Sequence, residues 1–326
     1  MKGSYKISVQ NNLVKYEFTI RRNITIIQGN SATGKTTLVD LIREYHLNGA
    51  DSGINLSCKK KCVVLEGNDW QQMLTLFTDC IVFIDEGNRF ISSKDFASAI
   101  KATDNYYVLI TREGLENLPY SVNEIYGIHT SGKYAGLKQV YHEFYHIYND
   151  YFQVKPINAI LTEDSNSGFD FFKNLSDGKY PCESAKGKSN ILNYLNKSEG
   201  ITLIVADGAA FGSQMDKVSK IIRQKNNAVL YLPESFEYLI LQAGLFKDSQ
   251  ITKVLNEPSD YIESKDYFSW EQFFTELLIK VSKDTYLKYS KKKLNKNYLE
   301  ESLKNKILNS EAFRIIKSIF YKSIKL

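Results

Sequence analysis

Short apolar runs and stretches of helical periodicity alternate along the chain. In the first half, a continuous β-branched run at 24–27 and apolar runs at 81–84 and 106–110 predict strands buried on both faces, because such strands lose the polar alternation of a half-exposed strand. Residues 37–45 carry apolar side chains three and four positions apart, which predicts a helix soon after the first of these strands. Buried strands separated by helices are typical of an α/β fold.

The second half repeats this pattern after Pro156. Apolar strands are predicted near 157–162, 201–206 and 228–232, with helical stretches between and after them. Strands that alternate with helices imply a second parallel sheet. After the last strand the pattern becomes helical, and residues 267–281 form an amphipathic stretch rich in aromatic residues, which we interpret as core packing or a subunit contact.

A glycine-rich turn between the first buried strand and its helix carries the strongest motif. Residues 29–36 fit G-x-x-x-x-G-K-[ST] without a mismatch, in the strand-turn-helix context that a phosphate loop requires. The backbone N–H groups of such a loop point at phosphate oxygens, beside a helix N-terminus whose dipole favours anions. The alternative is a glycine-rich turn before an ordinary helix. The predicted nucleotide-binding residues are Gly29, Asn30, Ser31, Ala32, Thr33, Gly34, Lys35, Thr36 and Thr37.

Two acids follow the next apolar run and complete the expected nucleotide site. Lys35 is expected to reach the β- and γ-phosphates, and the Thr36 hydroxyl to ligate Mg²⁺. The strand at 81–84 ends in Asp85 and Glu86, which resembles the second motif of P-loop ATPases. That resemblance implies that Asp85 holds Mg²⁺ through water and that Glu86 orients or deprotonates the attacking water. The alternative is a strand that merely ends in solvated acids.

The third strand of the first half ends in Thr111 and Arg112, at the edge where phosphates are expected. Arg112 either senses the γ-phosphate or pairs with the neighbouring Glu113. We expect ATP as the nucleotide, because the nearest approach to a guanine-reading Asn-Lys-x-Asp motif is NKSE at 196–199, outside the first half. Residues 5–20 resemble the antiparallel hairpin that transporter-type ATPases place before the phosphate loop, although no LSGGQ-like helix follows.

A second motif, HEFYH at 142–146, matches the zinc-protease pattern H-E-x-x-H, which requires a helix so that both histidines share a face. The surrounding residues alternate and favour β-structure, which predicts a strand. On a strand His142 and His146 lie about 13 Å apart, too far for one zinc ion. We therefore reject the zinc-protease interpretation.

In the second half, Glu163 and Asp207 end apolar strands and lie 44 positions apart. This order of elements resembles a Toprim domain, in which a Glu ends the first strand and a D-x-D turn ends a later one. The resemblance implies that both acids bind Mg²⁺ and act on a phosphodiester. The turn departs from the pattern, because it reads Asp207-Gly208-Ala209 and lacks the second acid. Metal affinity then requires that Asp164, Glu234 or Glu237 replace this acid. The plainer alternative is that α/β sheets often carry polar residues at their carboxyl ends.

Length and composition limit the number of domains and the cellular environment that we expect. The chain has 326 residues, enough for two domains, and 43% of them are hydrophobic. No apolar run reaches the roughly eighteen residues of a membrane span and no signal peptide is apparent, so we expect a cytoplasmic protein without membrane contact. Cys58 and Cys62 form C-x-x-x-C without a second pair, and we interpret them as solvated, reduced loop thiols.

Charge is concentrated at one end of the chain. Residues 284–326 carry eleven Lys or Arg against four Asp or Glu, a surplus of seven, while the whole chain is at +5. This basic tail is either a solvated helical face or a surface that binds nucleic acid. A homo-oligomer or a partner protein is also expected for an ATPase of this kind.

These patterns predict a P-loop ATPase domain over 1–153, a Toprim-like α/β domain over 154–250 and a basic helical region over 251–326. The arrangement resembles the OLD family of ATPase-nucleases, many of which act in defence against phage and mobile DNA. The resemblance implies Mg²⁺-dependent ATP hydrolysis coupled to action on nucleic acid. The predicted catalytic residues are Lys35, Glu86, Glu163 and Asp207, and the predicted metal ligands are Thr36, Asp85, Glu163 and Asp207.

Three alternatives remain open at this point. In the first, the protein is a non-nucleolytic switch whose degenerate acidic site binds a ligand or a partner, an interpretation that Ala209 favours. In the second, it is a small-molecule kinase, although no dedicated acceptor lid is apparent. In the third, it is a sensor whose ATPase turns over only on meeting a partner protein.

Overall fold

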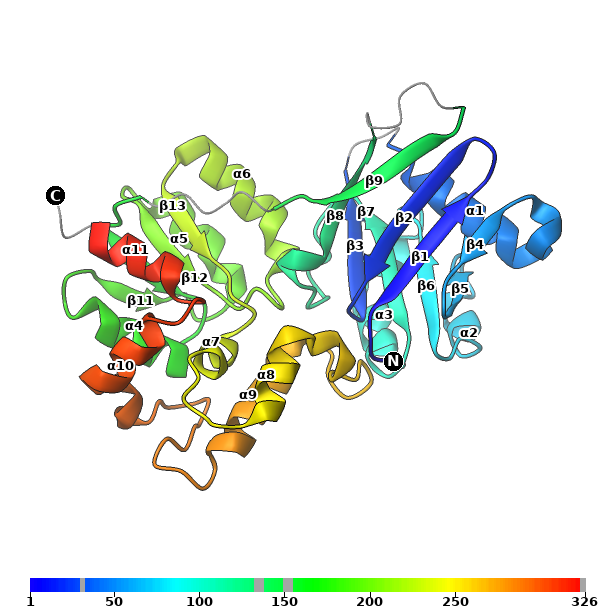
Figure 1. Cartoon of the computed structure of the whole chain (residues 1–326). Helices are drawn as coiled ribbons and strands as arrows, with labels where there is room; N and C mark the ends of the chain where they lie inside the picture. Colours follow the sequence, from blue (N-terminus) through cyan, green and yellow to red (C-terminus); the bar gives the residue numbers. More distant parts are fainter. Residues whose placement is uncertain (30–32, 132–137, 149–154, 323–326) are drawn as a thin grey trace. The chain divides into compact units, whose positions relative to one another are not determined.

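The computed structural model describes residues 1–29, 33–131, 138–148 and 155–322, and the chain divides into two compact units (Figure 1). The first unit comprises Met1–Tyr148 and Glu257–Phe268, and the second comprises Asn149–Asn256 and Ser269–Leu326. Residues 257–268 thus belong to the first unit, where the Gly3 N–H donates to the Ser259 carbonyl over 2.7 Å. The remainder of the predicted C-terminal region is part of the second unit.

The first unit contains a nine-stranded mixed sheet. Its strands are β1 (Tyr5–Gln10), β2 (Val14–Ile20), β3 (Ile24–Gln28), β4 (Asn55–Ser57), β5 (Lys61–Val64), β6 (Cys80–Ile84), β7 (Tyr106–Thr111), β8 (Ile125–Thr130) and β9 (Val140–His146). They are ordered β4-β1-β2-β9-β8-β3-β7-β6-β5, and the five strands from β8 to β5 run parallel. The predicted hairpin is confirmed, since β1 and β2 pair antiparallel through a turn too short for a parallel crossover.

This sheet is bent so that its two edge strands approach each other. β4 and β5 stand at opposite ends of the strand order, yet only residues 58–60 separate them along the chain. Four Cα steps span at most about 15 Å, whereas the edges of a flat nine-stranded sheet lie roughly 38 Å apart. Contacts across the bend agree with this, because the rings of Tyr5 in β1 and Tyr106 in β7 lie 5.7 Å apart.

The helix α1 (Lys35–Asn48) fills the inside of the bend. Its apolar face buries Leu38, Val39, Leu41 and Ile42 in one core cluster with residues of β1, β2, β6 and β7. The sequence predicted this helix and its apolar face, although the helix begins two residues earlier, at Lys35. The other helices of the first unit are α2 (Trp70–Leu74) and α3 (Lys94–Lys101).

The second unit contains a four-stranded, fully parallel sheet with helices around it (Figure 1). Its strands are β10 (Ala159–Thr162), β11 (Cys182–Ser184), β12 (Thr202–Val205) and β13 (Ala228–Tyr231), in the order β11-β10-β12-β13. Its helices are α4 (Ser167–Ser176), α5 (Ile191–Lys197), α6 (Met215–Lys225), α7 (Phe236–Gln242), α8 (Ser249–Asn256), α9 (Trp270–Ser282), α10 (Glu301–Leu308) and α11 (Arg314–Lys322). The predicted alternation of strands and helices is confirmed, and only the short β11 was missed.

The C-terminal helices pack against this unit. The aromatic stretch is α9, and it buries Trp270, Phe274 and Leu278, as core packing requires. Buried apolar residues continue into the basic tail, including Tyr298 and Phe313. The tail is therefore neither purely a solvated face nor purely a charged surface. Among the residues that the structure describes, we find no helix with the length and apolar character needed to cross a membrane.

Overall, the α/β class is confirmed. The large sheet differs from the predicted parallel one because it is mixed: the N-terminal hairpin, β4 and the antiparallel pair β8 and β9 extend the parallel core. Strand β9 carries HEFYH, as predicted, with His142 opposite Thr130 and His146 opposite Tyr126 in the pairing with β8.

Candidate functional site

The glycine-rich turn joins β3 to α1 at the carboxyl edge of the parallel strands. Its residues Asn30, Ser31 and Ala32 lie outside the described part of the chain. On either side, Gly29 has φ +146° and Gly34 has φ +89°, both in the region that favours glycine. Within the described part of the chain, no atom lies within 4 Å of a Cβ built on Gly29, so these residues leave the backbone there open to an approaching ligand.

Gly34 packs against the stacked rings of Tyr16 and His142. The Tyr16 hydroxyl donates to the Gly34 carbonyl over 2.9 Å, and the fully buried Tyr16 ring stacks on His142 at 4.5 Å with an interplanar angle of 4°. A Cβ on Gly34 would lie 2.6 Å from the Tyr16 hydroxyl and 3.0 Å from His142. Glycine at 34 is thus required by space as well as by φ. This support was invisible in the sequence, which singled out His142 only for a zinc motif.

Lys35 lies under the loop and is only 5% exposed. Its ammonium group donates to the Gly29 carbonyl over 3.0 Å and to the Thr33 hydroxyl over 3.2 Å, so it spans the loop from end to end. Burial lowers the pKa of Lys35, an effect that the nearby Glu86 opposes. A buried cation inside a glycine loop is suited to an anionic ligand.

The first turn of α1 presents further groups to the same side. Thr36 and Thr37 are exposed, and the Thr37 side chain also hydrogen-bonds to Tyr16. The open backbone at Gly29, the buried Lys35 and the N-terminus of a 14-residue helix together fit a triphosphate.

The two predicted acids follow β6, and β7 lies between β3 and β6 in the sheet. This order brings the end of β7 between the glycine loop and the acids. Arg112, just after β7, donates to Glu86 from Nε over 2.9 Å and from Nη2 over 2.6 Å. The proposed pairing of Arg112 with Glu113 is therefore wrong, because the sheet order places Glu86 within reach. The hydrogen bonds from Arg112 lower the pKa of Glu86.

Asp85 keeps a fixed position at the end of β6. Its Oδ1 accepts the Glu86 N–H over 2.8 Å, and its carbonyl accepts bonds from the backbone and side chain of Asn88, each over 3.1 Å. Asp85 and the exposed Thr36 are the oxygen donors expected for Mg²⁺ in this unit. Carboxylate and hydroxyl oxygens suit that ion chemically.

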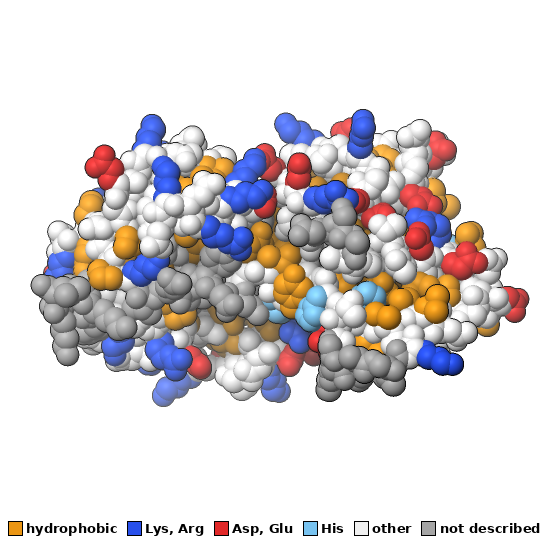
Figure 2. Space-filling model, turned by 90° about the horizontal axis from the view of Figure 1, so that it is seen from above, with side chains coloured by type: hydrophobic (Ala, Val, Ile, Leu, Met, Phe, Trp, Pro, Cys, Tyr) orange, Lys and Arg blue, Asp and Glu red, His pale blue; other side chains and the backbone are white. Residues whose placement is uncertain are grey.

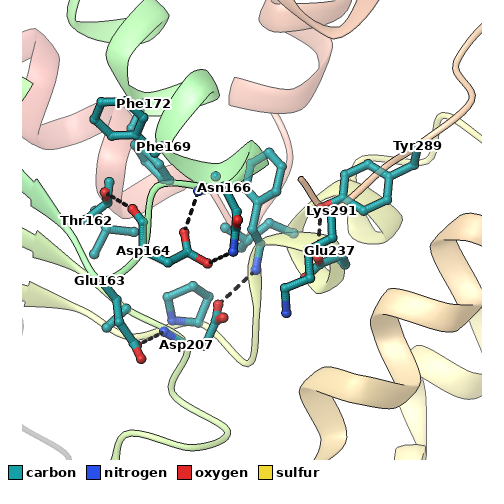
Figure 3. Close-up of a pocket in the computed structure, with 16 residues that line it drawn as sticks. Thr162, Glu163, Asp164, Asn166, Phe169, Phe172, Asp207, Glu237, Tyr289 and Lys291 are labelled. Atoms are coloured by element: carbon teal, nitrogen blue, oxygen red, sulfur yellow. Dashed lines mark hydrogen bonds between the residues drawn. The ribbon is translucent and has the colours of Figure 1, made fainter. Parts of the chain in front are cut away.

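The second predicted site lies at the carboxyl end of the four-stranded sheet, within the second unit (Figure 3). β10 and β12 are neighbours with Thr162 opposite Val205, so Glu163 and Asp207 emerge side by side. The Asp207 N–H donates to Glu163 Oε2 over 3.3 Å, and Asp207 Oδ1 accepts the Phe236 N–H over 3.2 Å. The structure thus brings together the two acids that the sequence paired.

The turn after Asp207, where the D-x-D pattern has its second acid, is closely packed. The Gly208 N–H donates to the Pro233 carbonyl over 2.6 Å, and a Cβ on Gly208 would lie 2.4 Å from the Leu232 carbonyl oxygen. Ala209 is 2% exposed, and its N–H donates to the Glu234 carbonyl over 3.2 Å. The departure from the Toprim pattern is therefore built into the packing of this turn.

The acids considered as replacements have other partners. Both carboxylate oxygens of Asp164 accept bonds from Asn166, over 3.1 Å from its backbone and 2.6 Å from its side chain. Glu237 is 2% exposed and accepts the Tyr289 hydroxyl bond over 2.7 Å. Figure 3 shows Asp164 turned toward Asn166, and Glu237 beside Tyr289 and Lys291.

Lys291 supplies positive charge to this pocket from the basic tail. It forms an ion pair with Glu271 of α9. Burial would lower the pKa of Lys291, but the carboxylates of Glu271, Glu237 and Asp207 together raise it above its ordinary value. Backbone contacts fix its position, because the Ser167 N–H at the start of α4 donates to the Lys291 carbonyl over 2.9 Å.

Burial dominates the protonation of the acids. It raises the pKa of Glu163 to about 7, although the Asp207 N–H opposes the change. Burial also raises the pKa of Asp207 well above its ordinary value, with Glu271, Glu237 and Glu163 adding to the effect. The pocket therefore favours neutral carboxyl groups near neutral pH.

The arrangement does not fit a divalent metal ion. Over the described residues, no three His, Cys, Asp or Glu side chains come together as a metal-binding group. The cavity has a volume of about 40 Å³, and its lining includes Lys291 as well as Glu163 and Asp207. Glu163 and Asp207, the predicted Mg²⁺ ligands, therefore lie next to each other but form no metal-coordinating cluster with a third such side chain among the described residues.

Sequence reasoning missed Tyr289 and Lys291, which line this pocket, and Glu271, which pairs with Lys291. Lys291 belongs to a lysine run that the sequence analysis treated only as surface charge. On the face shown in Figure 2, Lys and Arg side chains of the described residues are scattered among acidic and apolar ones. No signal in the sequence separates Lys291 from its neighbours.

A comparison with models of known protein families found no match, and a search of curated proteins found no relative.

Proposed function

We propose that the first unit binds and hydrolyses ATP. The observation that carries this proposal is Lys35, which is buried beneath the glycine loop with its ammonium group on the Gly29 carbonyl. Glu86 and Arg112 stand at the same edge of the sheet, on the strands next to the loop. A loop cation, a helix N-terminus and an acid at one edge are the parts that phosphoryl transfer from a nucleotide needs.

Each residue has a role that follows from its position. The N–H groups of the loop and of the first turn of α1 bind phosphate oxygens, and Lys35 neutralises their charge. Glu86, held ionised by Arg112, accepts a proton from the attacking water. Mg²⁺, when bound through Thr36 and Asp85, would neutralise charge on the transferred phosphoryl group. We expect ATP rather than GTP, because the chain lacks a guanine-reading motif in this unit.

The test is calorimetry with MgATP and MgGTP, together with phosphate release, on the purified chain. Lys35→Ala should weaken MgATP binding by about tenfold or more, since hydrogen bonds to charged groups contribute about 1.5–3 kcal/mol. The control is Lys101→Ala, an exposed lysine at the end of α3. Absence of binding heat in the parent chain, or equal binding in both variants, would refute the proposal.

We infer that the second unit works as a non-nucleolytic switch, whose acidic pocket binds a ligand or a partner. A specific observation favours this alternative: the backbone N–H groups of Asp207 and Phe236 already donate to Glu163 and Asp207, the carboxylates that a metal-dependent nuclease would use for its ions, and Lys291 lines the same pocket. In this interpretation, nucleotide binding changes the conformation or assembly of the protein.

Phosphodiester cleavage is the second candidate for this unit, and the convergence of Glu163 and Asp207 at the carboxyl end of a parallel sheet favours it. The experiment incubates the protein with DNA and RNA, with Mg²⁺ or Mn²⁺, and with or without ATP. Cleavage that disappears in Glu163→Ala but persists in Glu183→Ala, an exposed acid of β11, would establish the nuclease and refute the switch.

A further inference from the structure

The two cysteines near the edge strands have an environment that the sequence did not reveal. Cys58 directly follows β4, and Cys62 lies within β5, so they stand at the two ends of the link that joins the sheet edges (Figure 1). Cys62 is 4% exposed and packs in the core cluster against α1, while Cys58 is half-buried. The interpretation of both as solvated loop thiols is therefore wrong for Cys62.

The two thiols are neighbours in the fold. Both line one groove, Cys58 packs against the core cluster that contains Cys62, and the Cys62 thiol donates to the carbonyl of Lys60, which lies between them in the chain, over 3.8 Å. The neighbouring Cys62 side chain and the backbone of Lys60 and Lys59 lower the pKa of Cys58 to about 7, although burial opposes the change. The neighbouring Cys58 and burial raise the pKa of Cys62. One sulfur is thus prepared as a thiolate while its neighbour keeps its proton.

Of the two thiols, Cys58 is the one accessible from solvent. Both cysteines line an open groove of about 370 Å³, whose other lining residues are Tyr45, His46, Leu56, Lys59, Lys60 and Lys61. Three lysines make the groove electropositive, and Lys60 is in turn paired with Asp79. A half-exposed thiolate in basic surroundings is the environment in which cysteines react with oxidants.

We propose that Cys58 and Cys62 form a redox-active dithiol, a modification site that a peroxide converts into an intramolecular disulfide. The Cys58 thiolate attacks one oxygen of hydrogen peroxide, forming a sulfenic acid and releasing hydroxide. The Cys62 sulfur then attacks the sulfenic sulfur, which forms the disulfide and releases water, while its proton leaves with that water. Two electrons pass from the two thiols to one peroxide, and a dithiol reductant reverses the change.

This disulfide closes the link between the two sheet edges. The linked residues lie beside Tyr45 and His46, in the last turns of α1, whose first residue is Lys35. The inference rests on the thiols alone and does not require that the first unit bind ATP.

The test treats the full chain with hydrogen peroxide, blocks the remaining thiols with N-ethylmaleimide and maps the cysteines by mass spectrometry after digestion. We expect a peptide with a disulfide between Cys58 and Cys62, whose mass is lower by two hydrogen atoms than that of the reduced form. Dithiothreitol should restore the reduced mass. Cys182 is the internal control, because burial raises its pKa to about 11 although it is also half-buried. At neutral pH, Cys58 should be alkylated at least about tenfold faster than Cys182.

Two variants complete the test. Cys58→Ser should abolish the disulfide, and Cys62→Ser should leave a sulfenic acid on Cys58 that dimedone traps in greater yield than in the parent chain. Because Cys62 is buried, circular dichroism must show that this variant is folded, and the result on the parent chain stands without it. The proposal is overturned if peroxide leaves both thiols free, oxidises Cys182 as fast as Cys58, or produces only disulfides between chains.

Discussion

The guanidinium group of Arg112 donates two hydrogen bonds to the carboxylate of Glu86, over 2.9 Å and 2.6 Å. The two residues are 26 positions apart and meet because β7 lies beside β6 in the sheet. The pair fixes the direction of the carboxylate and keeps it ionised, which are the two properties that a general base requires.

Arg112→Ala should lower ATP turnover by about 10- to 100-fold, because a misdirected base loses part of the roughly 10²- to 10⁴-fold contribution of general base catalysis. The affinity for MgATP should change far less, since Arg112 is bonded to Glu86 rather than to the loop. Steady-state phosphate release and calorimetry measure the two effects. Arg89→Ala, an exposed arginine after the same β6 strand, is the matched control. A loss of affinity without a loss of turnover would contradict the assigned role.

The same variant should move the acid limb of the pH–rate profile. Arg112 lowers the pKa of Glu86 in the folded chain, so the base stays ionised to a lower pH than an ordinary glutamate. Without Arg112 the pKa of Glu86 rises, and turnover should begin to fall at a higher pH than in the parent chain. A pH–rate profile of both chains tests this. Superimposable acid limbs would show that Glu86 is not the titrating base.

Gly34→Ala should destabilise the first unit by about 1–3 kcal/mol, the cost of a strained backbone position. The new Cβ would meet the Tyr16 hydroxyl at 2.6 Å, so adding Tyr16→Phe should recover part of the loss. Urea denaturation of the two single variants and the double variant gives the coupling. Gly53→Ala is the control, because Gly53 also has a positive φ but no atom within 4 Å of its Cβ position. Additive losses would show that the two residues do not meet.

Glu163 should make the second unit less stable as the pH rises. Its pKa is raised by burial to about 7 in the folded chain, above the ordinary value of 4.5, so the folded state binds the extra proton between these values. Stability is therefore lost as the pH rises from about 4.5 toward 7, by up to about 3 kcal/mol. Glu163→Gln should remove this loss and unfold with less pH dependence. Denaturation at pH 5 and 8 measures the effect, with the exposed Glu183→Gln as the control. Equal slopes in Glu163→Gln and the parent would contradict the assignment.

Lys291→Met should destabilise the second unit by about 1.5–3 kcal/mol, because it removes the ion pair with Glu271 and leaves that carboxylate without its cation. Mn²⁺ should restore part of the loss in this variant and have little effect on the parent, since the ion would replace the cation that neutralises Glu271. Thermal unfolding with and without Mn²⁺ measures this. Lys220→Met, which breaks an exposed pair with Asp216, is the control. If Mn²⁺ stabilised the parent more than the variant, the role assigned to Lys291 would be wrong.

The sequence by itself determined the parts of this protein that are continuous along the chain. The strand, glycine turn and helix around Lys35 are adjacent in sequence, so spacing and periodicity predicted them together, and the same holds for the alternating strands and helices of the second half. The strand at 140–146 and its rejected zinc motif were also decided locally, because side-chain alternation is a property of neighbouring residues.

Only the tertiary structure decided which distant residues meet. The Glu86–Arg112 pair follows from strand order, and the support of Gly34 by Tyr16 and His142 follows from the pairing of β2 with β9. Lys291 lines the same pocket as Glu163 from 128 positions further along the chain (291 minus 163), through packing of a tail whose charge pattern resembled plain surface. Apolar periodicity encodes which face of an element is buried, but not which element covers it. The bend that joins β4 to β5, and with it the proximity of Cys58 and Cys62, therefore appeared only in the fold.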